Sequence, residues 1–464
     1  MLRRALAALA LLGCAPPASA TSDTGAAAST TSSTGAPASS EGSGSRGEDT
    51  TTTTGGSSTT APTEGTAADS SSTTGAQPPI VTATLITDQN RHYPEMHGGW
   101  GPHLRGVMHD DRARRWFVAD AGPSVEVNDA ILYFRHDPDG WTAVGSQPHL
   151  PGVQQNAASV LHGATLHTFA VDVVGHQLEH CSFDLDLALG QGCEPVAIGG
   201  PYTTPPNSNY VGAALGPDPV HLVWFTVVGD AGGAGALVYT YDYGGGYNGP
   251  VATALPGYND LGYVFASFRG PSEVVLAGQA FTGQYPTGSY DAVVVELTLG
   301  GTPAFTTLGD GDVDVRTAAD VHVDLGSDAT HVLAETDAGA LAYYFKPGGA
   351  AWSDHLAPVS LLPDSFRGRF VAVEGAPLAV VRGSASDGGI EILRADGDAD
   401  APIAWAQAEA IAVPGLGEGF GAPSALYVPS RSVLDGAIDR LEFVACGAYG
   451  VADGLLWHVD VDVP

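Results

Sequence analysis

The sequence has little positive charge and lacks the short motifs of several enzyme classes. Its 464 residues hold 18 Lys+Arg against 51 Asp+Glu, a formal net charge of −33, and Lys346 is its sole lysine. Such an acidic surface repels nucleic acid and anionic lipid headgroups, so neither is expected as a partner. The chain has no G-x-x-x-x-G-K-[ST] loop, no H-E-x-x-H, no G-x-S-x-G after residue 77 and no Rossmann fingerprint opening a helix.

Cysteine is scarce, with four in the chain, and no pair has CxxC spacing. Zinc sites and thioredoxin-like chemistry are therefore not indicated. Cys181 and Cys193 are twelve residues apart across a turn-rich stretch, which predicts a local disulfide in an oxidising compartment. Cys446 ends the apolar run LEFVAC and is expected to be a buried thiol.

The N-terminus has the pattern of a targeting signal. Two arginines precede a short apolar run, 5–12, which is too short to span a bilayer as a helix. The run ends in LLGC at 11–14, which resembles the lipobox of bacterial lipoproteins; the resemblance implies cleavage before Cys14 and a lipid on its thiol. Ala15 stands where aspartate marks inner-membrane retention, which favours the outer membrane. The alternative is ordinary secretion with cleavage at the A-x-A sequence of 18–20.

Residues 15–77 consist almost entirely of Ser, Thr, Gly, Ala and Pro. Such a segment cannot bury enough apolar surface to offset its chain entropy, and it predicts a disordered linker. The sequence thus divides into a signal peptide at 1–14, a linker at 15–77 and a folded domain at 78–464.

Residues 78–464 carry short apolar runs separated by Gly, Pro, Asp and Asn clusters, which predicts strands and turns. A strand–turn–strand feature recurs about every 53 residues, with its turns at Asp110, His162, Gly216, Gly270, Gly326, Gly375 and Pro429. A third apolar strand follows each one, and then a more polar fourth strand, which in the fifth unit is WSDHL at 352–356. Four strands per unit of this length are typical of a β-propeller blade.

The seventh unit ends after its third strand, while one extra strand, IVTATLIT at 80–87, precedes the first unit. Pairing the two would close the ring and leave no large open sheet edge. The fold class predicted is therefore all-β: a seven-bladed β-propeller of four-stranded blades, closed by its N-terminal strand. A β-sandwich or β-helix with irregular strands is the alternative.

The repeat resembles that of sialidase-like bacterial propellers, and DPDGW at 137–141 is its closest local match. The family's Asp-box, S-x-D-x-G-x-x-W, is not intact in the chain. A sialidase-like hydrolase would need converging arginines, a tyrosine nucleophile with a glutamate, and a general acid. The candidates for these roles are Arg105, Arg269, Arg316, Arg367, Arg369, Tyr93, Tyr258 and Glu418.

The entry to the first unit, RHYPEMHGGWGPHLR at 91–105, concentrates aromatic, imidazole and guanidinium groups. An aromatic ring there could stack on a sugar, and an arginine could bind a carboxylate bidentately. The residues of this expected ligand site are Tyr93, His97, Trp100, His103, Arg105, Arg316 and Arg369. Two alternatives stand beside it: a metal bound by His92, His97 and His103, or side chains that simply fill the channel.

No cofactor is expected, although two acidic runs, 309–315 and 396–400, space carboxylates in a way that can present oxygens to calcium. Asp-Gly turn chemistry explains them equally well. The sequence therefore predicts an exported monomer, lipid-anchored at the outer membrane or cell surface of a Gram-negative bacterium. It would bind an extracellular protein or glycan without catalysis. The alternatives are a sialidase-like glycoside hydrolase and a structural envelope component.

Overall fold

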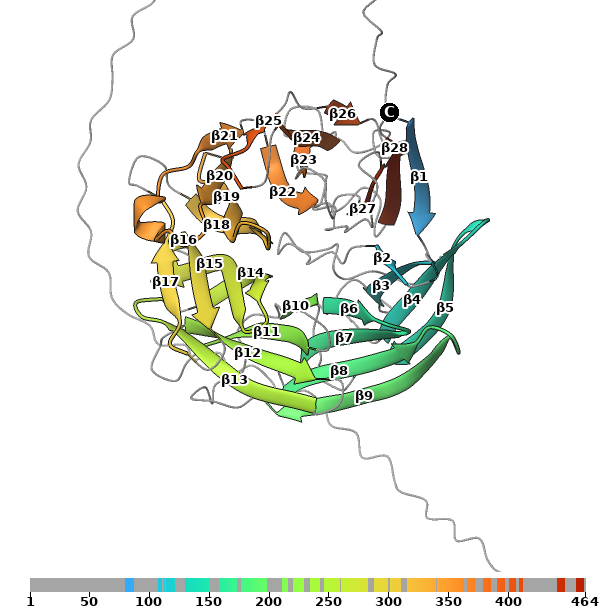
Figure 1. Ribbon diagram of the computed structural model, residues 1–464. Coiled ribbons are helices and arrows are strands. Elements are labelled where there is room, and N and C mark those ends of the chain that lie inside the picture. Colours follow the sequence, from blue (N-terminus) through green and yellow to red (C-terminus); the bar gives the residue numbers. More distant parts are fainter. Residues whose placement is uncertain are drawn as a thin grey trace, which may run out of the picture. The chain divides into compact units, whose positions relative to one another are not determined.

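The computed structural model (Figure 1) describes part of the chain, and every described residue belongs to the unit Thr74–Pro464. The described residues are 80–86, 107–110, 112, 114–121, 130–149, 158–172, 177–197, 211–215, 220–228, 234–242, 246–258, 260–282, 288–298, 301–309, 315–338, 340–362, 365–371, 379–384, 390–396, 400–405, 409–411, 440–446 and 456–462. The predicted signal peptide, Cys14 and the predicted linker lie outside them. No helix in these ranges is long and apolar enough to cross a membrane.

The described strands form seven antiparallel sheets. The first sheet holds β2 (Met108–His109), β3 (Arg115–Ala121), β4 (Ala130–Asp137) and β5 (Gly140–Pro148). The second holds β6 (Ala158–His162), β7 (Thr165–Asp172), β8 (Gln177–Asp184) and β9 (Leu189–Ala197). The third holds β10 (Val211–Leu215), β11 (Val220–Val228), β12 (Ala234–Asp242) and β13 (Gly246–Leu255).

The later sheets repeat this order. The fourth holds β14 (Asp260–Gly270), β15 (Glu273–Thr282), β16 (Ser289–Thr298) and β17 (Ala304–Thr307). The fifth holds β18 (Val315–Asp324), β19 (Ala329–Thr336), β20 (Leu341–Lys346) and β21 (Ser360–Leu362). The sixth holds β22 (Ser365–Val371), β23 (Ala379–Ser384), β24 (Ile390–Asp396), β25 (Ala404–Trp405) and β26 (Glu409–Ile411), the last pairing with β24. The closing sheet holds β27 (Arg440–Cys446), β28 (Leu456–Asp462) and β1 (Ile80–Ile86).

The sheets follow one another in chain order around a centre, with the first strand of each sheet innermost (Figure 1). Successive sheets contact each other through strand pairs such as β5 with β9, β6 with β10, β14 with β18 and β18 with β22. Four-stranded antiparallel sheets arranged in this way are the architecture of a β-propeller, which the repeat of about 53 residues predicts.

The fourth sheet is buried on both faces because it lies between two others. Along β15 the burial is nearly continuous, yet alternate residues face different cores. Val274 and Leu276 belong to a core with Leu261 of β14, whereas Val275 belongs to a core with Val321 of the fifth sheet. The strands therefore read as uninterrupted apolar runs, as expected for sheets stacked face to face.

The N-terminal strand completes the last sheet, as the sequence predicts. Strand β1 pairs antiparallel with β28 in unbroken register from Ile80 opposite Asp462 to Ile86 opposite Leu456. Its other neighbour is the first sheet, through contacts between β1 and β5. The two ends of the domain therefore share one sheet (Figure 1).

One strand assignment from the sequence is wrong. The fourth strand of the fifth unit does not begin at Trp352, because residues Trp352–Asp354 form a short 3-10 helix and β21 follows at Ser360–Leu362. Trp352 is buried in the core between the fourth and fifth sheets. Its indole sits 6.0 Å from the Nζ of Lys346. The Trp352 ring is buried beside the Lys346 ammonium from within this short helix, and the edge strand begins six residues after the helix ends.

Candidate functional site

Three consecutive inner strands carry an irregularity near their beginning. The pairing register shifts between Gly262 and Phe265 in β14, between Ala318 and Asp320 in β18, and between Phe366 and Gly368 in β22. Such bulges bend a strand and redirect its side chains, and they are common beside functional sites. The three strands belong to the fourth, fifth and sixth sheets, which follow one another in the chain.

Arg369 and Phe265 lie beside these bulges and contact each other. The guanidinium carbon of Arg369 stands 4.2 Å from the centroid of the Phe265 ring, and its Nη1 donates to the carbonyl of Gly368 at 3.3 Å. The arginine is buried, with 7% of its surface exposed. Cation–π contacts between desolvated partners contribute on the order of 2 kcal/mol. The pair joins the fourth sheet to the sixth and holds a permanent positive charge among the inner strands.

A carboxylate and a hydroxyl tie the same strands together. Asp320, which is 1% exposed, accepts hydrogen bonds from the backbone N–H of Val321 at 2.8 Å and of Phe370 at 2.9 Å. Ser267 Oγ accepts one from the backbone N–H of Val323 at 3.1 Å. We call Phe265, Ser267, Asp320 and Arg369 the inner-strand cluster. Backbone groups of the fifth and sixth sheets bind Ser267, Asp320 and Arg369, and the Phe265 ring contacts Arg369. The cluster is therefore a rigid arrangement of one cation, one anion and an aromatic face.

The chemistry of the inner-strand cluster suits recognition. A guanidinium is always protonated, so it does not transfer protons, and its forked N–H groups match a carboxylate or phosphate. Asp320 uses its two oxygens to bind backbone N–H groups. The cluster can therefore orient an anionic ligand more readily than it can perform acid–base catalysis.

The structure describes only some of the seven predicted ligand residues. Arg369 lies in the inner-strand cluster. Arg316 lies on β18, where its backbone but not its side chain is described. The remaining five, Tyr93, His97, Trp100, His103 and Arg105, lie outside the described residues, so the site at 91–105 stays a prediction.

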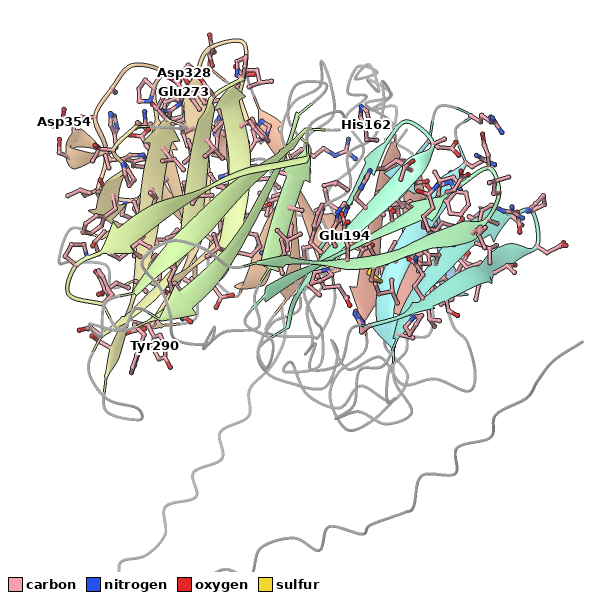
Figure 2. All side chains as sticks on the ribbon, turned by 90° about the horizontal axis from the view of Figure 1, so that it is seen from below. His162, Glu194, Glu273, Tyr290, Asp328 and Asp354 are labelled. Atoms are coloured by element: carbon pink, nitrogen blue, oxygen red, sulfur yellow. A yellow bond between two sulfur atoms is a disulfide. The ribbon has the colours of Figure 1, made fainter. Side chains whose placement is uncertain are left out.

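Two residues considered for a sialidase-like site are engaged elsewhere. Arg269 lies near the opposite end of β14 from the register shift at Gly262 and Phe265. Its Nη2 donates to Glu296 Oε1 at 2.6 Å, and its Nε forms an ion pair with Asp328 Oδ1 at 2.7 Å. Asp328 lies along one edge of the sheets, as does the labelled Glu273 (Figure 2). Arg269 therefore joins the fourth and fifth sheets and does not converge with Arg369.

Tyr258 is the second. Its hydroxyl hydrogen-bonds Thr307 Oγ1 of the outer strand β17 at 3.0 Å. Burial raises the pKa of Tyr258, whereas a tyrosine nucleophile needs its pKa lowered. Arg367 and Glu418 have no described side chain.

Sequence reasoning missed a group of buried histidines in the second sheet. His167 Nδ1 and His180 Nε2 are 2.8 Å apart, and the His180 ring stacks on Phe169 with ring centroids 4.8 Å apart. Burial lowers the pKa of His167 to about 3 and that of His180 to about 4, so both imidazoles are neutral. The signal that could have found them is position: each histidine occupies the middle of an apolar strand, TLHTFAV or QLEHCSF.

Cys181 and Cys193 are joined by a disulfide, at directly opposite positions of β8 and β9. Figure 2 shows its sulfur atoms in yellow, close to the labelled Glu194. Cys446 lies at the end of β27, opposite Leu456, and its side chain is not described. Most carboxylates of the two acidic runs lie outside the described residues, so calcium there stays a prediction.

Comparison with known proteins gives neither a family nor a curated relative. No family model matches the chain, and no curated protein matches it. Among solved structures, the polysaccharide lyase Uly1 is similar at 9% identity with a TM-score of 0.49, covering 82% of this chain and 99% of its own. An alpha-L-arabinanase of Penicillium chrysogenum is similar at 10% identity with a TM-score of 0.41, covering 82% and 98%. The Dos1 propeller is similar at 9% identity with a TM-score of 0.42, covering 78% and 81%.

Proposed function

We propose that the chain is a lipid-anchored, seven-bladed β-propeller that binds an extracellular ligand without catalysis. The blade count is supported by seven repeats in the sequence and by the seven sheets of the described strands, of which β1 completes the last. The ligand is a glycan or protein that presents an anionic group, such as a carboxylate. The chain acts as a monomer, and its sole attachment to the membrane is the lipid.

The observation that carries this proposal is the Arg369–Phe265 contact among the bulged inner strands. This cation is contacted by Phe265 of the fourth sheet and by the Gly368 carbonyl of the sixth. A guanidinium beside an aromatic face is suited to an acidic sugar or an acidic peptide. The predicted residues at 91–105 would supply further aromatic and basic contacts from the entry to the first blade. Ligand sites in proteins are typically concave places with a few well-placed polar groups.

Binding is tested with glycan arrays and pull-downs on the full chain, comparing the parent with Arg369→Ala. We expect the substitution to weaken binding of anionic ligands by about tenfold or more, which equals about 1.4 kcal/mol. Arg369→Lys, which keeps the charge but loses the fork, should fall between the two. Arg135→Ala is the matched control, because Arg135 pairs with Asp137 on β4, away from the inner strands, and should leave binding unchanged.

The result that would contradict the site is unchanged binding in Arg369→Ala and in the double variant Trp100→Ala with Arg105→Ala. The alternative function, a sialidase-like glycoside hydrolase, makes a different prediction. Under that alternative, glycosides bound by the parent would be cleaved, and reducing ends would accumulate with time. A chain that is only a structural envelope component would show neither binding nor cleavage.

The anchor is tested separately, by mass spectrometry of the mature N-terminus and membrane fractionation of the producing cell. We expect an N-terminal cysteine derived from Cys14 that carries acyl chains, in the outer-membrane fraction. Cys14→Ser should release the chain into the soluble fraction, because the thiol that carries the lipid is gone. A mature chain beginning at Thr21 would instead establish ordinary secretion.

A further inference from the structure

A buried carboxylate flanks the disulfide of the second sheet. A ligand oxygen of Glu179, the Sγ of Cys181 and the Sγ of Cys193 all lie within 4.8 Å of one another. Glu179 and Cys181 are fully buried, while Cys193 is partly exposed. Within the described ranges, no other three histidine, cysteine or acidic side chains gather so closely. A carboxylate with no access to water is costly unless charge or hydrogen bonds compensate it, and the imidazole of His149 lies against Glu179.

We propose that this is a redox-dependent zinc site. When the disulfide is reduced, the thiolates of Cys181 and Cys193 and the carboxylate of Glu179 bind one Zn²⁺, and water takes the fourth position. Thiolate and carboxylate are both ordinary zinc ligands, and three protein ligands with one open position are a known arrangement. In the oxidised chain the sulfurs are bonded to each other and the site is closed.

The sheet, and not the disulfide alone, brings the sulfurs together. Cys181 and Cys193 are directly opposite in the β8–β9 ladder, whose pairing continues on both sides of them. Side chains at opposite positions of antiparallel strands have Cβ atoms about 4.5–5.5 Å apart. Two thiolates on a tetrahedral zinc, each at about 2.3 Å, are about 3.8 Å apart. Reduction therefore leaves both sulfurs within reach of one metal ion.

The neighbouring first sheet supplies the surroundings that such a site needs. His149, just after β5, places its Nδ1 2.5 Å from Glu179 Oε1, so it can orient the carboxylate as outer-shell groups do in zinc proteins. The carbonyl of Pro148 lies 3.6 Å from Cys193 Sγ. On the apolar side, Cys181 shares a core with Trp116 and Phe183. The partly exposed Cys193 leaves a side open for the metal to enter.

The redox step balances with a dithiol as reductant. The dithiol gives two electrons and two protons to the Cys181–Cys193 bond, yielding two thiols, and its own sulfurs join in a disulfide. Zinc then replaces the two thiol protons, which pass to solvent. The sum is one disulfide, one dithiol and one Zn²⁺ giving one zinc dithiolate, one oxidised dithiol and two protons.

The test uses the full chain, either oxidised or reduced by a dithiol that is then removed without air. Co²⁺ serves as the spectroscopic probe and Zn²⁺ as its competitor. We expect the reduced chain to bind one Co²⁺ with a thiolate-to-cobalt charge-transfer band that Zn²⁺ abolishes, and the oxidised chain to show no such band. Glu179→Gln should keep the band but weaken binding by about tenfold or more, because one ligand charge is lost.

Cys446→Ser is the matched control and should bind as the parent does, because that thiol belongs to another sheet. Cys181→Ser and Cys193→Ser should each show a weaker charge-transfer band and should each bind Co²⁺ less tightly than the reduced parent. Far-ultraviolet circular dichroism, recorded before and after reduction, should keep the spectrum of the folded chain. Three results would overturn the proposal: equal cobalt binding by oxidised and reduced chains, a band that depends on Cys446, or loss of the folded spectrum on reduction.

Discussion

Two seams between neighbouring sheets are built from different chemistry. At the closing seam, where the closing sheet meets the first, Arg115 Nε of β3 forms an ion pair with Glu442 Oε1 of β27 at 2.7 Å, and Arg115 Nη2 donates to Asp460 Oδ2 of β28 at 3.3 Å. Glu442 is fully buried. His458 of β28 packs against the Trp141 ring of β5, with ring centroids 5.2 Å apart. The closing seam therefore relies on buried charge and imidazole.

The seam between the fourth and fifth sheets is mainly apolar. Its core consists of side chains such as Val275, Val294, Val321, Val332 and Tyr344. It also holds ion pairs: Arg269 pairs with Glu296 and Asp328, and the buried Lys346 has its Nζ 3.3 Å from Glu296 Oε1. The fourth and fifth sheets are close in the chain, because β17 ends at Thr307 and β18 begins at Val315, whereas the closing sheet meets the first only after the rest of the ring is made. Directional polar contacts can specify that one distant pairing, while apolar contacts need not distinguish one face from another.

The largest expected effect is at the buried carboxylate of the closing seam. Glu442→Ala should lower the free energy of unfolding by about 3 kcal/mol, because it removes the fully buried carboxylate and leaves Arg115 with Asp460 alone. Urea unfolding followed by tryptophan fluorescence measures it. Asp137→Ala is the control: it breaks a partly exposed ion pair with Arg135 and should cost about 1 kcal/mol or less. Similar losses in both variants would remove the distinction between the two kinds of contact.

Acid should weaken the closing seam through His458. Burial lowers the pKa of His458 to about 4 from the usual 6.5. The unfolded chain therefore takes up this proton first, and stability falls as the pH drops from about 6.5 towards 4. At about 1.4 kcal/mol per pKa unit, the loss is about 3 kcal/mol. The charged or titratable groups that face this imidazole are Arg115, His136, Glu442 and Asp460.

This pH dependence separates the two seams. Between pH 6.5 and 4, the free energy of unfolding of His458→Phe should fall by about 3 kcal/mol less than that of the parent, because the variant lacks this imidazole. His167 and His180 remain in both chains, so their contribution is the same in each. Val332→Ala, in the apolar seam, should cost about 2 kcal/mol at both pH values, because it removes two buried carbons and no titrating group. Urea unfolding at several pH values measures both. Equal pH slopes in His458→Phe and the parent would contradict the assignment.

Much of the fold was predictable because it repeats. The turn residues from Asp110 to Gly375 recur at nearly constant spacing, and a short strand left over at 80–87 matched a unit with one strand too few. The segment 352–356 was wrongly predicted to be a strand, because a tryptophan followed by polar residues is equally compatible with an edge strand and with a turn that buries the ring. Local pattern alone does not say which one forms.

The site was much less predictable. Arg369 and Phe265 come from sheets two units apart, and no spacing rule connects them. Glu442 and His458 each interrupt an apolar run, RLEFVAC or LLWHVDV, where a sequence shows only a polar residue on a strand. Arg115, which pairs with Glu442 and Asp460, lies more than three hundred residues away from both. Contacts of this kind follow from the closure of the ring, which the sequence pattern indicates without giving the side chains that meet.

The pairing of β1 with β28 also determines when the last sheet can form during synthesis. Strand β1 is the first of the domain to be synthesised and its partner is among the last, with roughly 370 residues between Ile86 and Leu456. At ~5–20 residues per second, β1 waits roughly 20–70 seconds for its partner strand. During that time it has no place in its sheet, and the first sheet lacks the neighbour that covers it. A chaperone that covers an unpaired strand would be needed most during that interval, and least once β28 has been synthesised.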